Sequence, residues 1–85
     1  MMNNLRNSVR GHFASGRHLA AARALAGLTQ LELAQLAGVH VNGIKRLERM
    51  DGRLGGMTGE RVADALQKRG ILIDRWPTPF VRLAG

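Results

Sequence analysis

Residues 29–48 read TQLELAQLAGVHVNGIKRLE, and this stretch decides the fold. Thr29 is a favoured helix N-cap, and apolar residues recur after it at helical spacing, which predicts a short helix over Gln30–Ala37. Gly38 ends that helix, and a new apolar pair at i, i+3 spacing begins almost at once. The interval is long enough only for a tight turn, so we predict a second helix that runs from Val41 to Arg49 or Met50.

Two further helices are expected to flank this unit. On its N-terminal side Ser15 is a good N-cap, and small apolar residues follow at helical spacing, which predicts a helix over Gly16–Ala26. On its C-terminal side, residues 51–56 have the glycine-rich composition of a loop. Thr58 follows that loop, and we expect it to cap a fourth helix over Gly59–Arg69.

The end of the chain, residues 71–85, has a different pattern. A β-branched-rich run at 71–73, a turn with two prolines at 76–79 and an alternating segment at 80–83 predict a two-stranded β hairpin. A lone hairpin is marginal in water, so it must either pair with a second chain, which we predict, or cover the helical core of its own chain. The second alternative requires Ile73 and Trp76 to be buried within one subunit. The predicted dimerisation residues are Ile71, Ile73, Trp76, Phe80 and Val81.

The chain thus divides into three parts. Residues 1–15 are basic, lack acidic residues and show no sustained apolar period, so we expect a flexible N-terminal arm, with a short extra helix as the alternative. Residues 16–70 form the helical domain, and 71–85 the hairpin. Eighty-five residues are enough for one hydrophobic core. The predicted fold class is mainly α, with four helices and a C-terminal two-stranded hairpin.

Composition excludes several classes of function. The chain has no Cys, so thiolate metal sites and cysteine nucleophiles are absent. Its three His lie in different predicted elements and are interpreted as an arm residue, a surface residue and a helix cap: His12, His18 and His40. No triad, carboxylate pair or metal spacing is present, so we expect no enzyme, no metal and no cofactor. The absence of a membrane span or signal-peptide pattern predicts a cytoplasmic location.

The charge balance points toward polyanions. Thirteen Lys and Arg against six Asp and Glu give a formal net charge of +7. A field of that sign favours nucleic acid first and an anionic membrane second. The plain alternative is a solvated surface that keeps a small protein soluble, so the positions of the charges must decide.

The predicted helix over Val41–Arg49 has two chemically different faces. At 100° per residue from Ile44, Leu47 falls on the same side, and the two centre a buried face. The polar side chains fall about 100° to 200° around the helix: Asn42, Lys45, Arg46 and Arg49. Two short helices, a turn containing Gly and a basic second helix are the sequence form of a DNA-reading helix-turn-helix.

Asn42 and Arg46 are the predicted base readers, because Arg offers paired donors to guanine and Asn pairs with adenine in the major groove. Val41 lies near the helix start and is predicted to touch a thymine methyl; the alternative is a half-buried turn residue. The predicted phosphate contacts are Gln30, Lys45 and Arg49. Ordinary solvated charge is the alternative for the two basic residues. Helix capping is the alternative for Gln30, which lies beside free N–H groups at a helix start.

Two opposite charges are predicted to point inward. The same arithmetic places Arg23 about 40° from Leu19, and Glu48 about 40° from Ile44 toward the core side. A charge on an inward face is expensive unless it is paired. We therefore predict that Arg23 and Glu48 form a partly buried ion pair that joins the first helix to the third.

These residues together resemble a known family. The segments L19xxAR, G27LTQxxLA, A37GV and I44xxLE are similar to the Xre family, the Cro/C1-type helix-turn-helix regulators, over residues 15–70. The resemblance implies an all-helical DNA-binding domain, usually dimeric on a near-palindromic operator, and the same ion pair. It implies DNA contacts by four residues: Gln30, Val41, Asn42 and Arg46. Members often accompany phages and other mobile elements.

Two residues depart from the family pattern. His40 stands where members usually have Ser or Thr, and Gly43 occupies a helix-interior position at a cost of about 1 kcal/mol. The hairpin also replaces the fifth helix of phage repressors, so the dimer geometry is not carried over. We expect a homodimeric DNA-binding regulator, a repressor or autoregulator. The alternative is an antitoxin or anti-activator of the same fold that acts through another protein.

Overall fold

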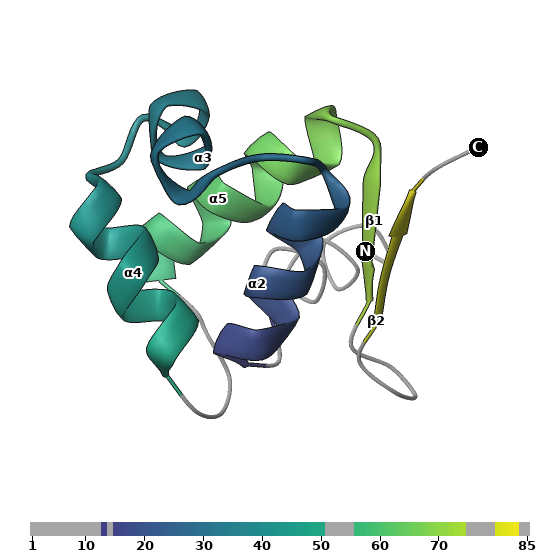
Figure 1. Cartoon of the computed structure of the whole chain (residues 1–85), viewed down its shortest axis with the longest axis horizontal. Helices are drawn as coiled ribbons and strands as arrows, with labels where there is room; N and C mark the ends of the chain where they lie inside the picture. The colour runs from purple at the N-terminus through teal and green to yellow at the C-terminus, as the bar shows by residue number, and fades with distance from the viewer. Residues whose placement is uncertain (1–12, 14, 51–55, 75–79, 84–85) are drawn as a thin grey trace, which may run out of the picture.

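The structure is a computed structural model that describes residues 13, 15–50, 56–74 and 80–83 (Figure 1). Among the described residues, four helices precede a two-stranded antiparallel hairpin, which confirms the predicted fold class. The elements are α2 Gly16–Leu25, α3 Gln30–Ala37, α4 Val41–Arg49, α5 Gly56–Lys68, β1 Ile71–Asp74 and β2 Phe80–Leu83. None of the described helices is both long and apolar enough to cross a membrane.

Local capping explains why the first helices start where they do. The Ser15 hydroxyl accepts a hydrogen bond from the His18 N–H at 3.3 Å, at the start of α2. A capping box starts α3: the Glu32 N–H donates to the Thr29 hydroxyl at 3.0 Å, and the Thr29 N–H donates to the Glu32 carboxylate at 2.8 Å. Gly38 ends α3 in the left-handed conformation, with φ of 70°. The predicted bounds of α3 are therefore correct.

The prediction for α5 was wrong at its start. The helix begins at Gly56, not at Gly59, so Thr58 lies inside the helix rather than at its N-cap. Gly56, with a φ of 80°, makes the turn into the helix, so a side-chain cap at Thr58 is not needed. The methyl group of Thr58 lies against α4, 3.9 Å from where a Cβ on Gly43 would stand. Smaller differences occur elsewhere: α2 ends at Leu25, and α5 ends at Lys68.

The core begins before the predicted domain boundary at residue 16. Phe13 is fully buried in the same apolar cluster as Leu19, Ile44 and Leu66. The interpretation of His18 as a surface residue was wrong: it is buried, and its ring meets the Phe13 ring edge-on at 5.5 Å between centroids. The remainder of the predicted arm, residues 1–12 and 14, lies outside the described residues.

The hairpin packs its apolar face onto the helices of its own chain. Strand β1 packs against α5 and strand β2 against α2, and Ile73 pairs with Val81 across the sheet. Ile71 and Ile73 are buried in the core, and Val81 packs partly against it. Leu72 and Arg82, which pair with each other, are exposed on the other face.

The side chains of Ile71 and Ile73 therefore cannot make the predicted dimer contact, because they are already buried within one chain. The strands alternate, so burying one face of the hairpin on the helices leaves only the other face outside. Trp76 and the Phe80 side chain lie outside the described residues. The alternative that the sequence left open, a hairpin that covers the core of its own chain, is correct for Ile73.

Candidate nucleic-acid interface

Helix α4 begins with an unusual cap. The Asn42 N–H donates to His40 Nδ1 at 3.2 Å, so the imidazole takes the place of the hydroxyl that caps many helices. The His40 carbonyl also accepts from the Gly43 N–H at 2.9 Å. His40 is thus a helix cap, as its position in the sequence predicted. The cap fixes the start of α4.

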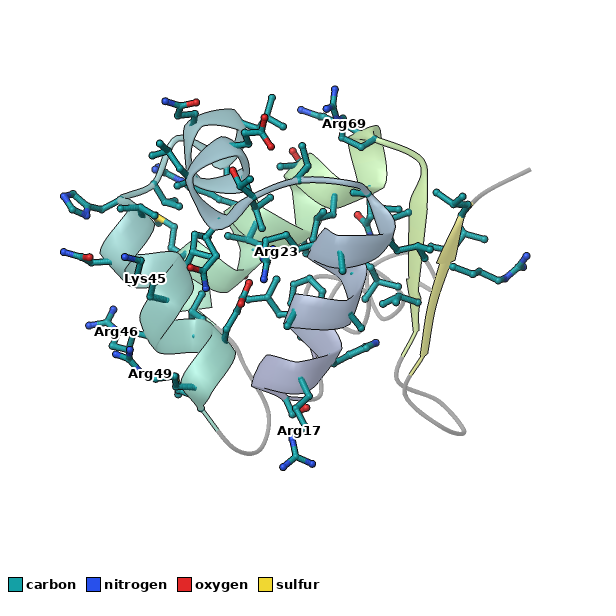
Figure 2. All side chains as sticks on the ribbon, viewed as in Figure 1. Arg17, Arg23, Lys45, Arg46, Arg49 and Arg69 are labelled. Carbon is teal, nitrogen blue, oxygen red and sulfur yellow. The ribbon has the colours of Figure 1, made fainter. Side chains whose placement is uncertain are left out.

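The two faces of α4 are as different as the helical arithmetic predicted. Ile44 and Leu47 are buried in the core. The side chains on the opposite face are all exposed: Asn42, Lys45, Arg46 and Arg49. In Figure 2 the three labelled cations of this set lie along the outer side of α4, away from the rest of the molecule. The face therefore presents donors and positive charge to solvent, and no carboxylate from a described residue is paired with them.

Val41 lies between these two faces. It is half-buried and packs against the core next to the turn that joins α3 to α4. The structure thus places it beside the exposed polar residues of α4 while part of its side chain supports the fold. Its predicted contact with a thymine methyl can involve only the part that remains exposed.

Behind α4, Arg23 of α2 and Glu48 lie against each other. Arg23 Nε donates to Glu48 Oε2 at 2.6 Å, and Arg23 Nη2 donates to Glu48 Oε1 at 3.0 Å. Such a two-point contact holds both planar groups in one orientation. The third guanidinium nitrogen, Nη1, donates to the Leu28 carbonyl at 3.0 Å. The hydrogen bonds that Arg23 donates to Glu48 raise the pKa of Arg23 above its ordinary value.

Burial makes this pair structurally important. The Glu48 side chain is only 9% exposed and that of Arg23 21%. A carboxylate this well covered is costly without partners, and here each oxygen has at least one donor. The pair joins α2 to α4 and, through Leu28, to the loop before α3. It therefore holds α4 in place from the side opposite its exposed face.

Gln30 is the second residue that donates to this carboxylate. Its amide nitrogen Nε2 donates to Glu48 Oε1 at 3.0 Å. The sequence predicted Gln30 as a phosphate contact with helix capping as the alternative, and it did not predict this bond. An amide nitrogen carries two N–H groups, so one remains for a ligand. Helical periodicity places a side chain on a face of its own helix but does not identify a partner 18 residues away, so the local sequence carries no signal for this bond.

Gly16 is a second residue that sequence reasoning missed. Its N–H donates to the Met50 carbonyl at 3.0 Å, so the start of α2 touches the end of α4. A Cβ at Gly16 would fall 2.6 Å from the Leu47 carbonyl oxygen and closer still to that of Glu48. Only glycine permits this approach. The signal in the sequence was a glycine directly after an N-cap, where a side chain would ordinarily be tolerated.

No metal-binding cluster is found in the described part of the chain. No group of three or more His, Asp or Glu side chains lies together in the described part of the chain. The exposed polar face of α4 is the candidate interface among the described residues.

Comparison with known proteins agrees with this geometry. A family model described as a helix-turn-helix matches residues 19–71, which extends from α2 through α5 to the first residue of β1. No curated protein matches the chain, and no solved structure does. The match covers the two helices around the tight turn and both helices that pack against them.

Proposed function

The chain belongs to the Cro/C1-type helix-turn-helix family of DNA-binding regulators, and on that basis we propose that it reads a specific double-stranded DNA sequence with α4 in the major groove. The observation that carries this proposal is the exposed face of α4. It presents one amide and three cations, and it is held rigidly from behind by the Arg23–Glu48 pair. A fixed helix with donors on its outer face is what major-groove reading requires.

The four side chains divide into two roles. Asn42 and Arg46 have the paired groups that recognise adenine and guanine edges, so we assign them to base reading. Lys45 and Arg49 flank the same face, and we assign them to phosphates, which position the protein without specifying sequence. The part of Val41 that stays exposed adds an apolar contact near the helix start.

Gln30 supports the interface in a different way. Its free amide N–H, at the start of α3, is proposed to meet a phosphate while its other N–H stays bonded to Glu48. Phosphate binding by Gln30 would therefore be coupled to the same carboxylate that holds α4.

We also propose that the protein acts as a homodimer on a near-palindromic operator and represses transcription, including its own. The support is family membership together with the size of the reading surface. One α4 carries only two base-reading polar side chains, which specify too short a site to be rare in a genome. Two half-sites read by two copies lengthen the recognised sequence. The buried Ile71 and Ile73 are not part of the proposed interface.

The test is a fluorescence-anisotropy titration of the protein against its own upstream DNA and a scrambled duplex, at several salt concentrations. Asn42→Ala and Arg46→Ala should each weaken binding to the specific duplex by about 1 to 3 kcal/mol, with little change for the scrambled one. Arg82→Ala is the matched control, because it removes an exposed cation from the hairpin. If both α4 variants bind the upstream DNA as tightly as the unaltered protein, α4 is not the reading helix.

The dimer proposal needs its own measurement. Sedimentation of the protein with a full operator and with each half-site should give two chains on the former and weaker, single-chain binding on the latter. A single chain bound with equal affinity to the full operator and to one half-site would contradict the dimer.

A further inference from the structure

The start of α2 lies directly beside the end of α4, and this contact is built into the backbone. The Gly16 N–H donates to the Met50 carbonyl at 3.0 Å, and glycine is required for the close approach. Arg17 follows immediately in α2. Its position relative to Arg49, which ends α4, is therefore fixed by the packing of two helices and not by a long flexible loop.

Arg17 extends the row of cations on α4. Figure 2 shows Lys45, Arg46 and Arg49 succeeding one another toward the end of α4, with Arg17 farther along at the same end of the molecule. Its side chain is exposed and points away from the helices. Among the described residues no carboxylate pairs with it, whereas Arg23 and Lys68 each have one. Its charge is therefore available to a ligand.

We propose that Arg17 is a DNA phosphate contact that extends the interface from α4 onto α2; this inference rests on the proposed reading of DNA by α4. With α4 in the major groove, the groove is bounded on each side by a sugar-phosphate strand. A guanidinium held just beyond the last turn of α4 meets that strand and not a base edge. Arg suits the position because its planar group can donate two parallel hydrogen bonds to one phosphate.

The contact is made by the side chain and not by the helix end. The N–H groups of Gly16 and His18 are already used, by the Met50 carbonyl and the Ser15 hydroxyl. Of these two N–H groups and the Arg17 guanidinium, the guanidinium is therefore the one left to bind an anion. A phosphate contact carries no sequence information, so Arg17 contributes affinity for any duplex rather than preference for one.

Arg17→Ala tests this proposal in the same titrations, on the full chain with its upstream duplex and the scrambled duplex. Binding to both duplexes should weaken by the same factor, roughly three- to tenfold, and the salt slope should fall by about 0.9. Arg17→Lys keeps the charge but not the paired donors, so it should recover most of the salt slope and part of the affinity. Because Arg17 is exposed, its variants should melt at the temperature of the unaltered protein.

Arg69→Ala is the matched control. Arg69 is also an exposed arginine, but it lies at the far end of α5, on the side of the molecule opposite Arg17 (Figure 2). It should alter neither the affinity nor the salt slope. An Arg17→Ala protein that behaves like Arg69→Ala overturns the proposal, and so does one that loses preference for the specific duplex alone.

The failure of this inference can be told apart from failure of the proposed function. If Asn42→Ala and Arg46→Ala lose specific binding while Arg17→Ala does not change it, α4 reads DNA and only the extension to α2 is wrong. If the unaltered protein binds neither duplex, both proposals are wrong.

Discussion

Helix α4 and the C-terminal hairpin lie at opposite ends of the molecule (Figure 1), and they use their side chains in opposite ways. In α4 the apolar residues Ile44 and Leu47 hold the helix in place, and the polar residues are displayed to solvent. In β1 the apolar residues Ile71 and Ile73 are buried in the core of their own chain. The hairpin therefore contributes apolar side chains to the core, whereas α4 also displays a polar face to solvent.

The difference shows what kind of residue reveals an interface. Exposed cations and an amide on one helix face are expensive to bury, so their pattern alone predicts a surface. Apolar residues on a strand suit a core and an interface equally well, because both remove them from water. The hairpin could therefore be read as a dimer element or as a cover for the core until the positions of the helices were known.

The largest expected effect comes from the support behind α4. Glu48→Ala should lower the free energy of unfolding by about 3 to 5 kcal/mol, because it leaves Arg23 partly buried without its partner and frees Gln30. Urea or thermal denaturation measures this. Arg46→Ala, on the exposed face of the same helix, should stay within about 0.5 kcal/mol. Equal stability of the two variants would show that α4 is not held in the way described.

The next largest effect tests the hairpin. Ile71→Ala should destabilise the fold by about 2 to 5 kcal/mol, since Ile71 is 1% exposed in the core. Its neighbour Leu72 is 39% exposed on the other face, so Leu72→Ala should cost much less. Denaturation at two protein concentrations separates core from interface. If Ile71→Ala left the stability nearly unchanged and instead abolished self-association, Ile71 would be a dimer contact and not a core residue.

A smaller loss is expected at the contact between α2 and α4. Gly16→Ala should cost about 1 to 3 kcal/mol, because the new Cβ would meet the Leu47 and Glu48 carbonyls, which are backbone and cannot turn aside. Gly27→Ala provides a comparison of another kind. Gly27 has open space around it but a φ of 73°, so its cost comes from the backbone alone. An unchanged melting temperature for Gly16→Ala would refute the close packing of the two helices.

The smallest effect is a gain. Gly43→Ala should stabilise the protein by about 1 kcal/mol, because alanine favours a helix interior and its Cβ would only touch the Thr58 methyl at 3.9 Å. Specific DNA affinity should be unchanged, since Gly43 lies on the side of α4 that faces α5. A loss of DNA binding with increased stability would instead place the Gly43 backbone against DNA.

Much of this molecule followed from local sequence. The bounds of α3, the His40 cap and the two faces of α4 depend on capping groups and on a period of 3.6 residues, which act within a few residues of one another. The inward placement of Arg23 and Glu48 also followed, because unpaired charges on two inward faces leave few other arrangements.

Other features were decided only when distant residues met. Thr58 could cap a helix by its own sequence, yet it packs beside Gly43; Phe13 lies in a basic segment, yet the core buries it. The Gln30 amide donates to Glu48, which lies 18 residues away in the sequence. Glycine is required at position 16 because two carbonyl oxygens of α4 lie against it. In the hairpin, alternation showed that one face would be covered, but only the packing of α2 and α5 determined that its own chain covers it. Local sequence sets which groups need partners, and the tertiary structure decides which partners they receive, because burial depends on segments far apart in the chain.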